Sequence, residues 1–161
     1  MKEKILVHKV HGLCKIIEEL EINGQDFLMV SSLEDNSLKI YCPKIKFSEF
    51  FRDLVSKEEA TNIISYMKNL KDTHIESTKQ QRTMLLDLLY SGDLKNLAYL
   101  NIALLRYQTE KAKRKQLLST IESKVLKASN KMLVDELSLS LDVPKDKLNS
   151  DILVWASNGS N

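Results

Sequence analysis

The sequence predicts an α+β protein, with a small antiparallel β-sheet or open barrel first and a compact all-helical part after it. Within residues 1–46, short apolar runs rich in β-branched residues alternate with turn signals. From Phe47 onward, apolar residues recur at spacings of three and four, which is typical of amphipathic helices. We therefore expect a β-domain over residues 1–56, a helical domain over residues 57–150 and a C-terminal tail over residues 151–161.

Four short strands are expected in the β-domain. The first two cover residues 4–10 and 13–20, and Asn23-Gly24 predicts a type I′ hairpin turn into a third strand at residues 27–30. The fourth strand, residues 38–42, alternates with period two and ends at Pro43, because proline cannot donate to a β-ladder. Such a small sheet has exposed edges that can recruit a partner strand. The alternative is that the following helix merely covers them.

Helix starts in the second part follow from capping chemistry. Ser56 and Ser119 each stand three residues before a glutamate, which is the capping-box pattern. Ser77 is the expected cap of a further helix, and Ser91-Gly92-Asp93 is expected to end that helix and begin another. A short last helix is expected to begin near Pro144.

The composition is typical of a protein that folds around an apolar core. The 161 residues are 43% hydrophobic and 29% charged. No N-terminal apolar run is long enough for a signal peptide or a membrane span, so we expect a cytoplasmic location and no membrane partner. Cys14 and Cys42 are interpreted as reduced, buried thiols, with a disulfide or a metal pair as the alternative.

Charge is distributed unevenly along the chain. Residues 1–56 carry 8 Lys/Arg and 9 Asp/Glu, whereas residues 57–161 carry 16 and 13. Residues 106–131 alone hold eight basic and two acidic residues. Phosphates favour lysine and arginine presented on helices, so any nucleic-acid contact belongs to the second part. The alternative is a solvated face between two amphipathic helices.

The sequence shows no pattern typical of catalysis. His8 and His11 have no carboxylate or cysteine at a ligand spacing, so turn or surface positions are the preferred interpretation. No pair of acidic residues stands out as an acid/base couple, and no glycine-rich phosphate loop is present. We therefore expect a protein that is not an enzyme, with no metal, cofactor or small-molecule substrate. We therefore expect the function to depend on surfaces that bind other macromolecules.

A series of motifs resembles one family. Val7-His8-Lys9-Val10-His11-Gly12, then Ile22-Asn23-Gly24, Tyr41-Cys42-Pro43, Tyr90-Ser91-Gly92-Asp93 and residues 118–139 follow one another in the order found in CarD/CdnL proteins. The resemblance covers roughly residues 5–148. It implies a Tudor-like RNA polymerase-interacting domain joined to a helical domain. In this family, the N-terminal sheet docks on the lobe of the RNA polymerase β subunit by strand pairing.

The resemblance points to residues 37–42 as the docking edge. Family members often carry arginines on this surface, and Leu20 and Tyr41 occupy two such positions here, so the contact is expected to be more apolar. The residues expected to bind the polymerase are Leu20, Leu38, Lys39, Ile40, Tyr41 and Cys42.

The resemblance also implies that the helical domain contacts promoter DNA without strong sequence specificity. In the family, a tryptophan wedges into the minor groove at the edge of the melted region. That position falls near Thr78, where this chain has no tryptophan, so the wedge is not carried over. Trp155 is expected to pack on the core. The residues expected to contact DNA are Lys79, Arg82, Arg106, Lys124, Lys127 and Lys131, and residues 111–115 add four further basic side chains.

Two hypotheses for function follow. The first is a transcription regulator that binds the polymerase β subunit and contacts promoter DNA through a salt-sensitive basic face, and is therefore associated with the nucleoid. The second is a protein-interaction adaptor whose helical domain recruits another protein and does not contact DNA.

Overall fold

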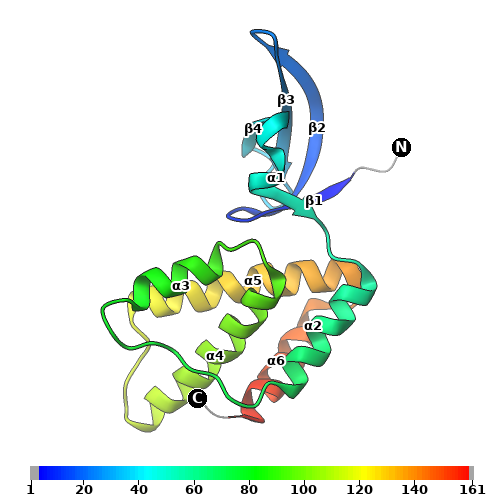
Figure 1. The fold of residues 1–161 in the computed structure, drawn as a ribbon. Coiled ribbons are helices and arrows are strands. Elements are labelled where there is room, and N and C mark those ends of the chain that lie inside the picture. The colour runs from blue at the N-terminus through cyan, green and yellow to red at the C-terminus, as the bar shows by residue number, and fades with distance from the viewer. Residues whose placement is uncertain (1–3, 160–161) are drawn as a thin grey trace. The chain divides into compact units, whose positions relative to one another are not determined.

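The computed structural model describes residues 4–159, which form a five-stranded antiparallel sheet followed by a set of helices (Figure 1). The chain divides into two compact units between Leu54 and Val55. We call them the β-unit and the helical unit. The division lies two residues before the predicted boundary, because Val55 is bonded to the helical unit. Its N–H donates to Glu136 (3.0 Å), and its carbonyl accepts from the Ser140 hydroxyl (2.8 Å).

The sheet has the strand order β4-β3-β2-β1-β5, and neighbouring strands are antiparallel. The strands are β1 (Ile5–His8), β2 (Gly12–Ile22), β3 (Gln25–Ser32), β4 (Lys39–Pro43) and β5 (Phe51–Asp53). The four predicted strands are present, but the expectation of a helix from Phe47 onward is wrong in part. A 3₁₀ helix, η1 (Lys44–Lys46), and one turn of helix, α1 (Phe47–Phe50), lead into β5, which pairs with β1.

The turn between β2 and β3 has the predicted chemistry. Asn23 and Gly24 both have positive φ, at 51° and 79°. Type I′ turns require this conformation at both central residues, and asparagine and glycine adopt it at the lowest steric cost. The predicted hairpin is confirmed.

One face of the sheet forms the core of the β-unit. Its buried side chains come from β1 to β5, and Ile16, Ile40 and Phe47 pack against them. Cys14 and Cys42 are both buried and neither forms a disulfide, as expected. The buried side chains are Leu6, Cys14, Leu28, Val30, Cys42 and Phe51.

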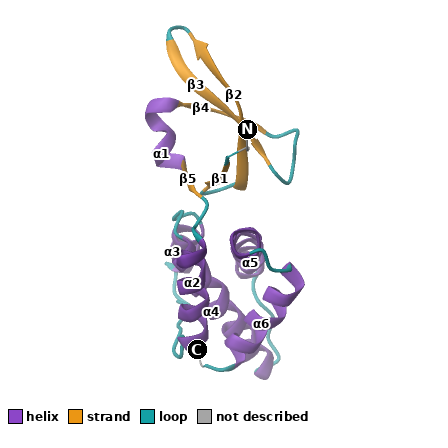
Figure 2. Cartoon of the chain, turned by 90° about the vertical axis from the view of Figure 1, so that its right-hand side faces the viewer, coloured by secondary structure: helices purple, strands orange, loops and turns teal. Residues whose placement is uncertain are grey.

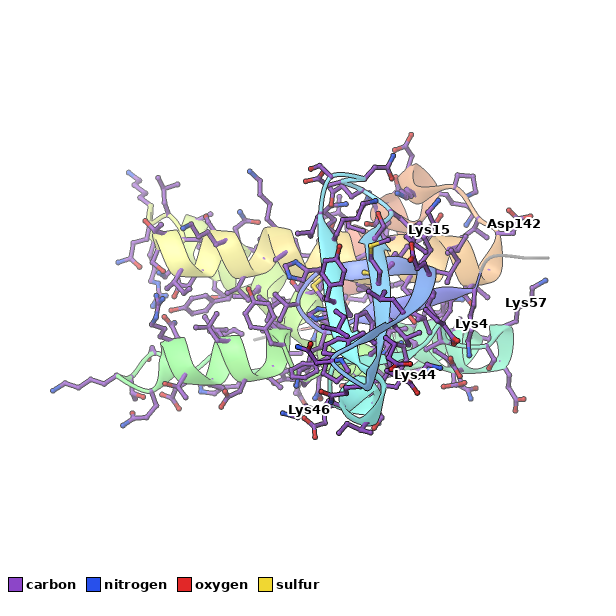
Figure 3. All side chains as sticks on the ribbon, turned by 90° about the horizontal axis from the view of Figure 1, so that it is seen from above. Lys4, Lys15, Lys44, Lys46, Lys57 and Asp142 are labelled. Atoms are coloured by element: carbon purple, nitrogen blue, oxygen red, sulfur yellow. The ribbon has the colours of Figure 1, made fainter. Side chains whose placement is uncertain are left out.

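The helical unit contains α2 (Lys57–Asn69), α3 (Gln81–Leu89), α4 (Leu94–Lys113), α5 (Thr120–Leu141) and α6 (Lys145–Ser157). Both capping boxes are confirmed: the Ser56 hydroxyl accepts from the Glu59 N–H, and the Ser119 hydroxyl accepts from the Glu122 N–H. Asp142, labelled in Figure 3, ends α5 in the left-handed conformation, with φ of 54°. The core is apolar and centred on α4, from which Leu100, Ile102 and Leu104 are fully buried.

Two predicted boundaries are wrong. Ser77 does not cap a helix; its N–H donates to Glu76, and α3 begins at Gln81 after a turn. The expected tail over residues 151–161 does not begin at residue 151, which lies inside α6. The reason is packing: Leu148, Ile152 and Ala156 recur every four residues and are buried along one side of α6.

None of the helices in the described part of the chain is both long and apolar enough to cross a membrane.

The buried side chain of His8 stabilises the turn between β1 and β2. Its Nδ1 accepts hydrogen bonds from the N–H groups of Val10 and His11, both at 3.1 Å, and its ring lies against Phe50 and Phe51. Burial, and then the charges of His11 and Lys9, lower the pKa of His8 to about 4. The neutral ring is therefore the form that fits the fold, because a protonated Nδ1 could not accept these bonds.

The first prediction concerns the stability of the β-unit in acid. The unfolded chain binds a proton at His8 near pH 6.5, whereas the folded chain binds it only near pH 4. The contribution of His8 to stability is therefore complete above about pH 6.5 and is lost as the pH falls towards 4. Urea denaturation followed by β-unit amide NMR signals at pH 7 and pH 4.5 should show this loss in the wild type and less of it in His8→Asn.

His74→Asn is the matched control, because His74 is exposed in the helical unit. An equal acid sensitivity of the β-unit in the His8 variant and the wild type would contradict this role.

Candidate functional site

β4 is an edge strand, and its register shows which of its backbone groups face away from the sheet. Ile40 pairs with Val30, and the Leu38 carbonyl accepts from the Ser32 N–H at 3.3 Å. Backbone groups alternate in direction along an antiparallel strand, so those of Ile40 face β3 and those of Lys39 and Tyr41 face outward. The edge can therefore accept a further strand through Lys39 and Tyr41.

The sheet face opposite the core carries an apolar patch beside this edge. Tyr41 is 55% exposed and pairs with Met29, and Leu20 pairs with Phe27, which lies two residues from Met29 on the same face. We call Leu20, Phe27, Met29 and Tyr41 the outer face. The resemblance predicts Leu20 and Tyr41 on one surface, whereas Phe27 and Met29 were not expected there. The run Phe27–Val30 is apolar on both faces, so its pattern does not show which side chains lie outside.

Two of the expected contact residues do not belong to this surface. The Cys42 side chain is 3% exposed in the core of the β-unit, and Ile40 packs against the same core. Burial raises the pKa of both cysteine thiols, that of Cys14 to about 11, so neither is a reactive thiolate at neutral pH. Ile40 and Cys42 were expected to bind the polymerase; their side chains belong to the core, and their place in the docking strand stays a prediction. Leu38, just before β4, is half-buried, so part of its side chain is still exposed.

η1 adds positive charge where β4 ends. Lys44 and Lys46 are exposed on it and are labelled in Figure 3. Lys44 forms an ion pair with Glu19 of β2 at 3.0 Å, with both side chains largely in solvent, so the pair adds little stability.

Arg106 is not available to DNA, contrary to the sequence-based expectation. It is 4% exposed, and its guanidinium donates to four backbone carbonyls. Nε donates to Ala156 (2.8 Å), Nη1 to Lys71 (3.1 Å), and Nη2 to Leu70 (2.6 Å) and Trp155 (3.3 Å). Burial lowers the pKa of Arg106, while the Asp72 carboxylate favours its charged form. The side chain is a structural tie between α4 and the ends of α2 and α6.

A second tie joins the start of α3, the end of α4 and the start of α5. Glu122 is buried and accepts from Lys111 (2.9 Å), Gln81 (2.6 Å) and the Ser119 N–H (2.8 Å). Burial would raise the pKa of Glu122, but these hydrogen bonds outweigh it and hold the pKa below the usual value. Like Arg106, Lys111 therefore forms a bond within the helical unit, to Glu122.

This tie gathers exposed basic residues at one end of the helical unit. Lys79 lies in the turn before α3, Arg82 lies in the first turn of α3, and Arg114 and Lys115 follow α4. We call these four residues the basic end. Lys113 is exposed beside it and forms an ion pair with Glu110 at 3.2 Å.

The remaining basic candidates lie along α5. Lys124, Lys127 and Lys131 are exposed, and their spacing of three and four places them on one side of the helix. Lys131 forms an ion pair with Asp135 at 2.8 Å. Burial would raise the pKa of Asp135, but hydrogen bonds from Lys131 and Lys145 hold it below the usual value. The six predicted DNA contacts therefore do not form one surface.

Trp155 has the expected role. It is half-buried on α6, packs against the apolar core of the helical unit, and Lys68 lies over its ring. Thr78, where the family wedge would fall, is exposed in the turn before α3.

Within residues 4–159, no group of histidine, cysteine, aspartate or glutamate side chains is arranged to hold a metal ion. No protein-family model matches this chain, and no curated protein matches it either.

The second prediction concerns Arg106. Arg106→Met leaves several buried carbonyls without donors, so it should lower the free energy of unfolding of the helical unit by about 2–4 kcal/mol. Urea denaturation followed by Trp155 fluorescence measures this, since Trp155 is the only tryptophan in the chain. Arg82→Met, an exposed position, is the control and should change the stability by no more than about 0.5 kcal/mol. Equal midpoints for the two variants would contradict the structural role.

Proposed function

We propose that this protein is a non-enzymatic transcription regulator that binds the lobe of the RNA polymerase β subunit through its β-unit. The observation that carries the proposal is the β4 edge, with the outward backbone of Lys39 and Tyr41 next to the apolar outer face. An added strand gains backbone hydrogen bonds at such an edge, and side chains beside it give specificity. The resemblance of residues 5–148 to CarD/CdnL proteins names the polymerase as the partner.

A Tudor-like identity of the β-unit is part of this proposal. In its favour are a short antiparallel sheet in which β1 pairs with both β2 and β5, and a bulge at Ile17 that bends β2. Binding to polymerase would place the protein in the cytoplasm, at the nucleoid.

For the helical unit we propose contact with promoter DNA without sequence specificity, centred on the basic end. Lys79 and Arg82 were among the expected contacts, and Arg114 and Lys115 belong to the basic stretch noted in the sequence. Exposed cations of this kind release counterions from the phosphate backbone, so affinity should fall steeply with salt. Stabilisation of melted DNA by a tryptophan wedge is not part of the proposal, because Thr78 stands at that position.

The alternative is an adaptor that binds polymerase, or another protein, and does not contact DNA. The burial of Arg106 and the pairing of Lys111 and Lys131 favour it, because they remove three cations from the surface or compensate them locally.

The third prediction tests the β4 edge. Tyr41→Pro removes an N–H that faces away from β3 and leaves the ladder between β3 and β4 intact. Its affinity for the β-subunit lobe should fall at least about tenfold, which corresponds to losing one or two backbone hydrogen bonds. Tyr41→Ala, which keeps the N–H and removes the ring, should weaken binding less. Calorimetric titration of the lobe measures both, with β-unit amide NMR spectra as the folding check. Wild-type affinity in a folded Tyr41→Pro protein would contradict binding of the lobe at the β4 edge.

The fourth prediction tests the basic end. The Lys79→Glu, Arg82→Glu double variant should bind a forked promoter duplex more weakly than wild type at low salt. Its plot of log affinity against log salt should be shallower by about one unit for each phosphate contact removed. Lys131→Glu is the control, because Asp135 already compensates Lys131. Anisotropy titrations at two salt concentrations measure these effects. Absence of binding by the wild type at low salt would favour the adaptor.

A further inference from the structure

An open groove runs across the helical unit between α5 and α6, with α4 below it. Its volume is about 590 Å³. Figure 2 shows α5 nearly end-on, with α6 next to it. The side chains that line the groove are Leu105, Gln108, Ser123, Lys124, Leu126, Lys127, Asn130, Asn149, Ile152 and Leu153.

The groove combines an apolar floor with a positive rim. Leu105, Leu126 and Ile152 supply the floor, Lys124 and Lys127 stand on the α5 side, and none of the lining residues is acidic. Among residues 4–159, no carboxylate lies within ion-pair distance of either lysine. The contrast with the paired lysines of the same unit is clear. Lys111, Lys131, Lys145 and Lys147 all have carboxylate partners.

The α6 wall adds apolar surface that is not covered. Leu153 lines the groove and is 59% exposed, and its neighbour Val154 is 56% exposed. Single exposed apolar residues are ordinary on a protein surface. Here Leu153 continues an apolar groove, and a contiguous apolar surface rimmed by polar groups is typical of an interaction site.

We propose that this groove binds an acidic amphipathic helix of another protein. Apolar side chains of the partner, spaced three and four residues apart, would cover the floor and Leu153, as in other helix-in-groove complexes. Lys124 and Lys127 are three residues apart, so they lie about 4.5 Å apart along α5. Carboxylates three or four residues apart on a partner helix have a matching spacing.

Shape and charge favour this occupant over DNA. The phosphate backbone is matched by cations on an open polar surface, whereas here two cations border a hollow of leucine and isoleucine side chains. Asn149 on α6 adds hydrogen-bonding groups that a peptide can use. Asn130 on α5 adds its side-chain oxygen, since its amide nitrogen donates to Asn101 at 3.4 Å. The inference goes beyond the proposed polymerase and DNA contacts and does not depend on either.

The experiment uses the full chain, labelled with ¹⁵N, and a synthetic helical peptide that carries leucine at helical spacing on one face and glutamate on its flanks. The first control peptide has lysine in place of each glutamate. The second has the same composition with the leucines scattered. We expect the acidic peptide to shift amide signals of α4, α5 and α6 around the groove, and both controls to bind at least about tenfold more weakly.

Variants locate the site. Lys124→Glu with Lys127→Glu, and separately Leu153→Asp, should each weaken the acidic peptide at least about tenfold. All three residues are exposed, so folding should be retained. Lys79→Glu with Arg82→Glu is the matched control: it makes the same change in charge at the basic end and should leave peptide binding unchanged.

The outcomes separate this inference from the proposed function. Loss of DNA binding in the Lys79, Arg82 variant with intact peptide binding supports two surfaces on the helical unit. The inference is overturned if the acidic peptide does not bind, if its shifts lie outside the groove, or if the lysine peptide binds equally well. It is also overturned if a short DNA duplex, and not the peptide, shifts the groove signals. None of these results bears on the β4 edge.

Discussion

The helical unit depends on one buried guanidinium. The carbonyls at and just beyond a helix end lack the regular donors of the helix, and Arg106 donates to such carbonyls just after α2 (Leu70 and Lys71) and in the last turn of α6 (Trp155 and Ala156). Its planar group can serve several acceptors at once because it carries five N–H bonds in a fixed geometry. Close packing reinforces the tie, since a Cβ added at Gly159 would collide with this guanidinium and with the Lys71 carbonyl. By fixing α6 against α4, Arg106 fixes one wall of the groove relative to its floor.

The features that the sequence predicts well are those decided by a few neighbouring residues. The Asn23-Gly24 turn and the capping boxes at Ser56 and Ser119 are set by backbone conformation and by hydrogen bonds over three residues, so their patterns are local. β5 escapes prediction because its three residues become a strand only by pairing with β1, far away in the sequence. The role of Arg106 escapes for the same reason: its acceptors lie 35 to 50 residues away, and its neighbours along the chain do not reveal them.

The candidate sites follow the same rule. Family resemblance brings Leu20 and Tyr41 to one face of the sheet, and the register agrees, but only the register adds Phe27 and Met29 to that face. The basic stretch over residues 106–131 is a poor guide to the DNA-binding residues, because a count of charges does not show which side chains form ion pairs or hydrogen bonds within the fold. Folding assigns Arg106 to carbonyls and Lys111 to Glu122, and leaves Lys124 and Lys127 beside a groove. A basic run in a sequence therefore does not show which cations can bind a ligand. The fold decides this, because it buries or pairs some of the side chains and leaves the others exposed.

Tethering decides how strong the contacts of the helical unit need to be. Val55 is held on α5 by Glu136 and Ser140, so the chain between β5 and this anchor is very short. Once the β-unit is bound to a large partner, a second site on that assembly meets the helical unit at an effective concentration that reaches the millimolar range for short linkers. A groove with Lys124 and Lys127 on its rim, or a basic end with four cations, then needs only a weak free affinity to bind. Under the proposed function, weak, salt-sensitive contacts of the helical unit can therefore exchange while the protein stays bound through the β-unit.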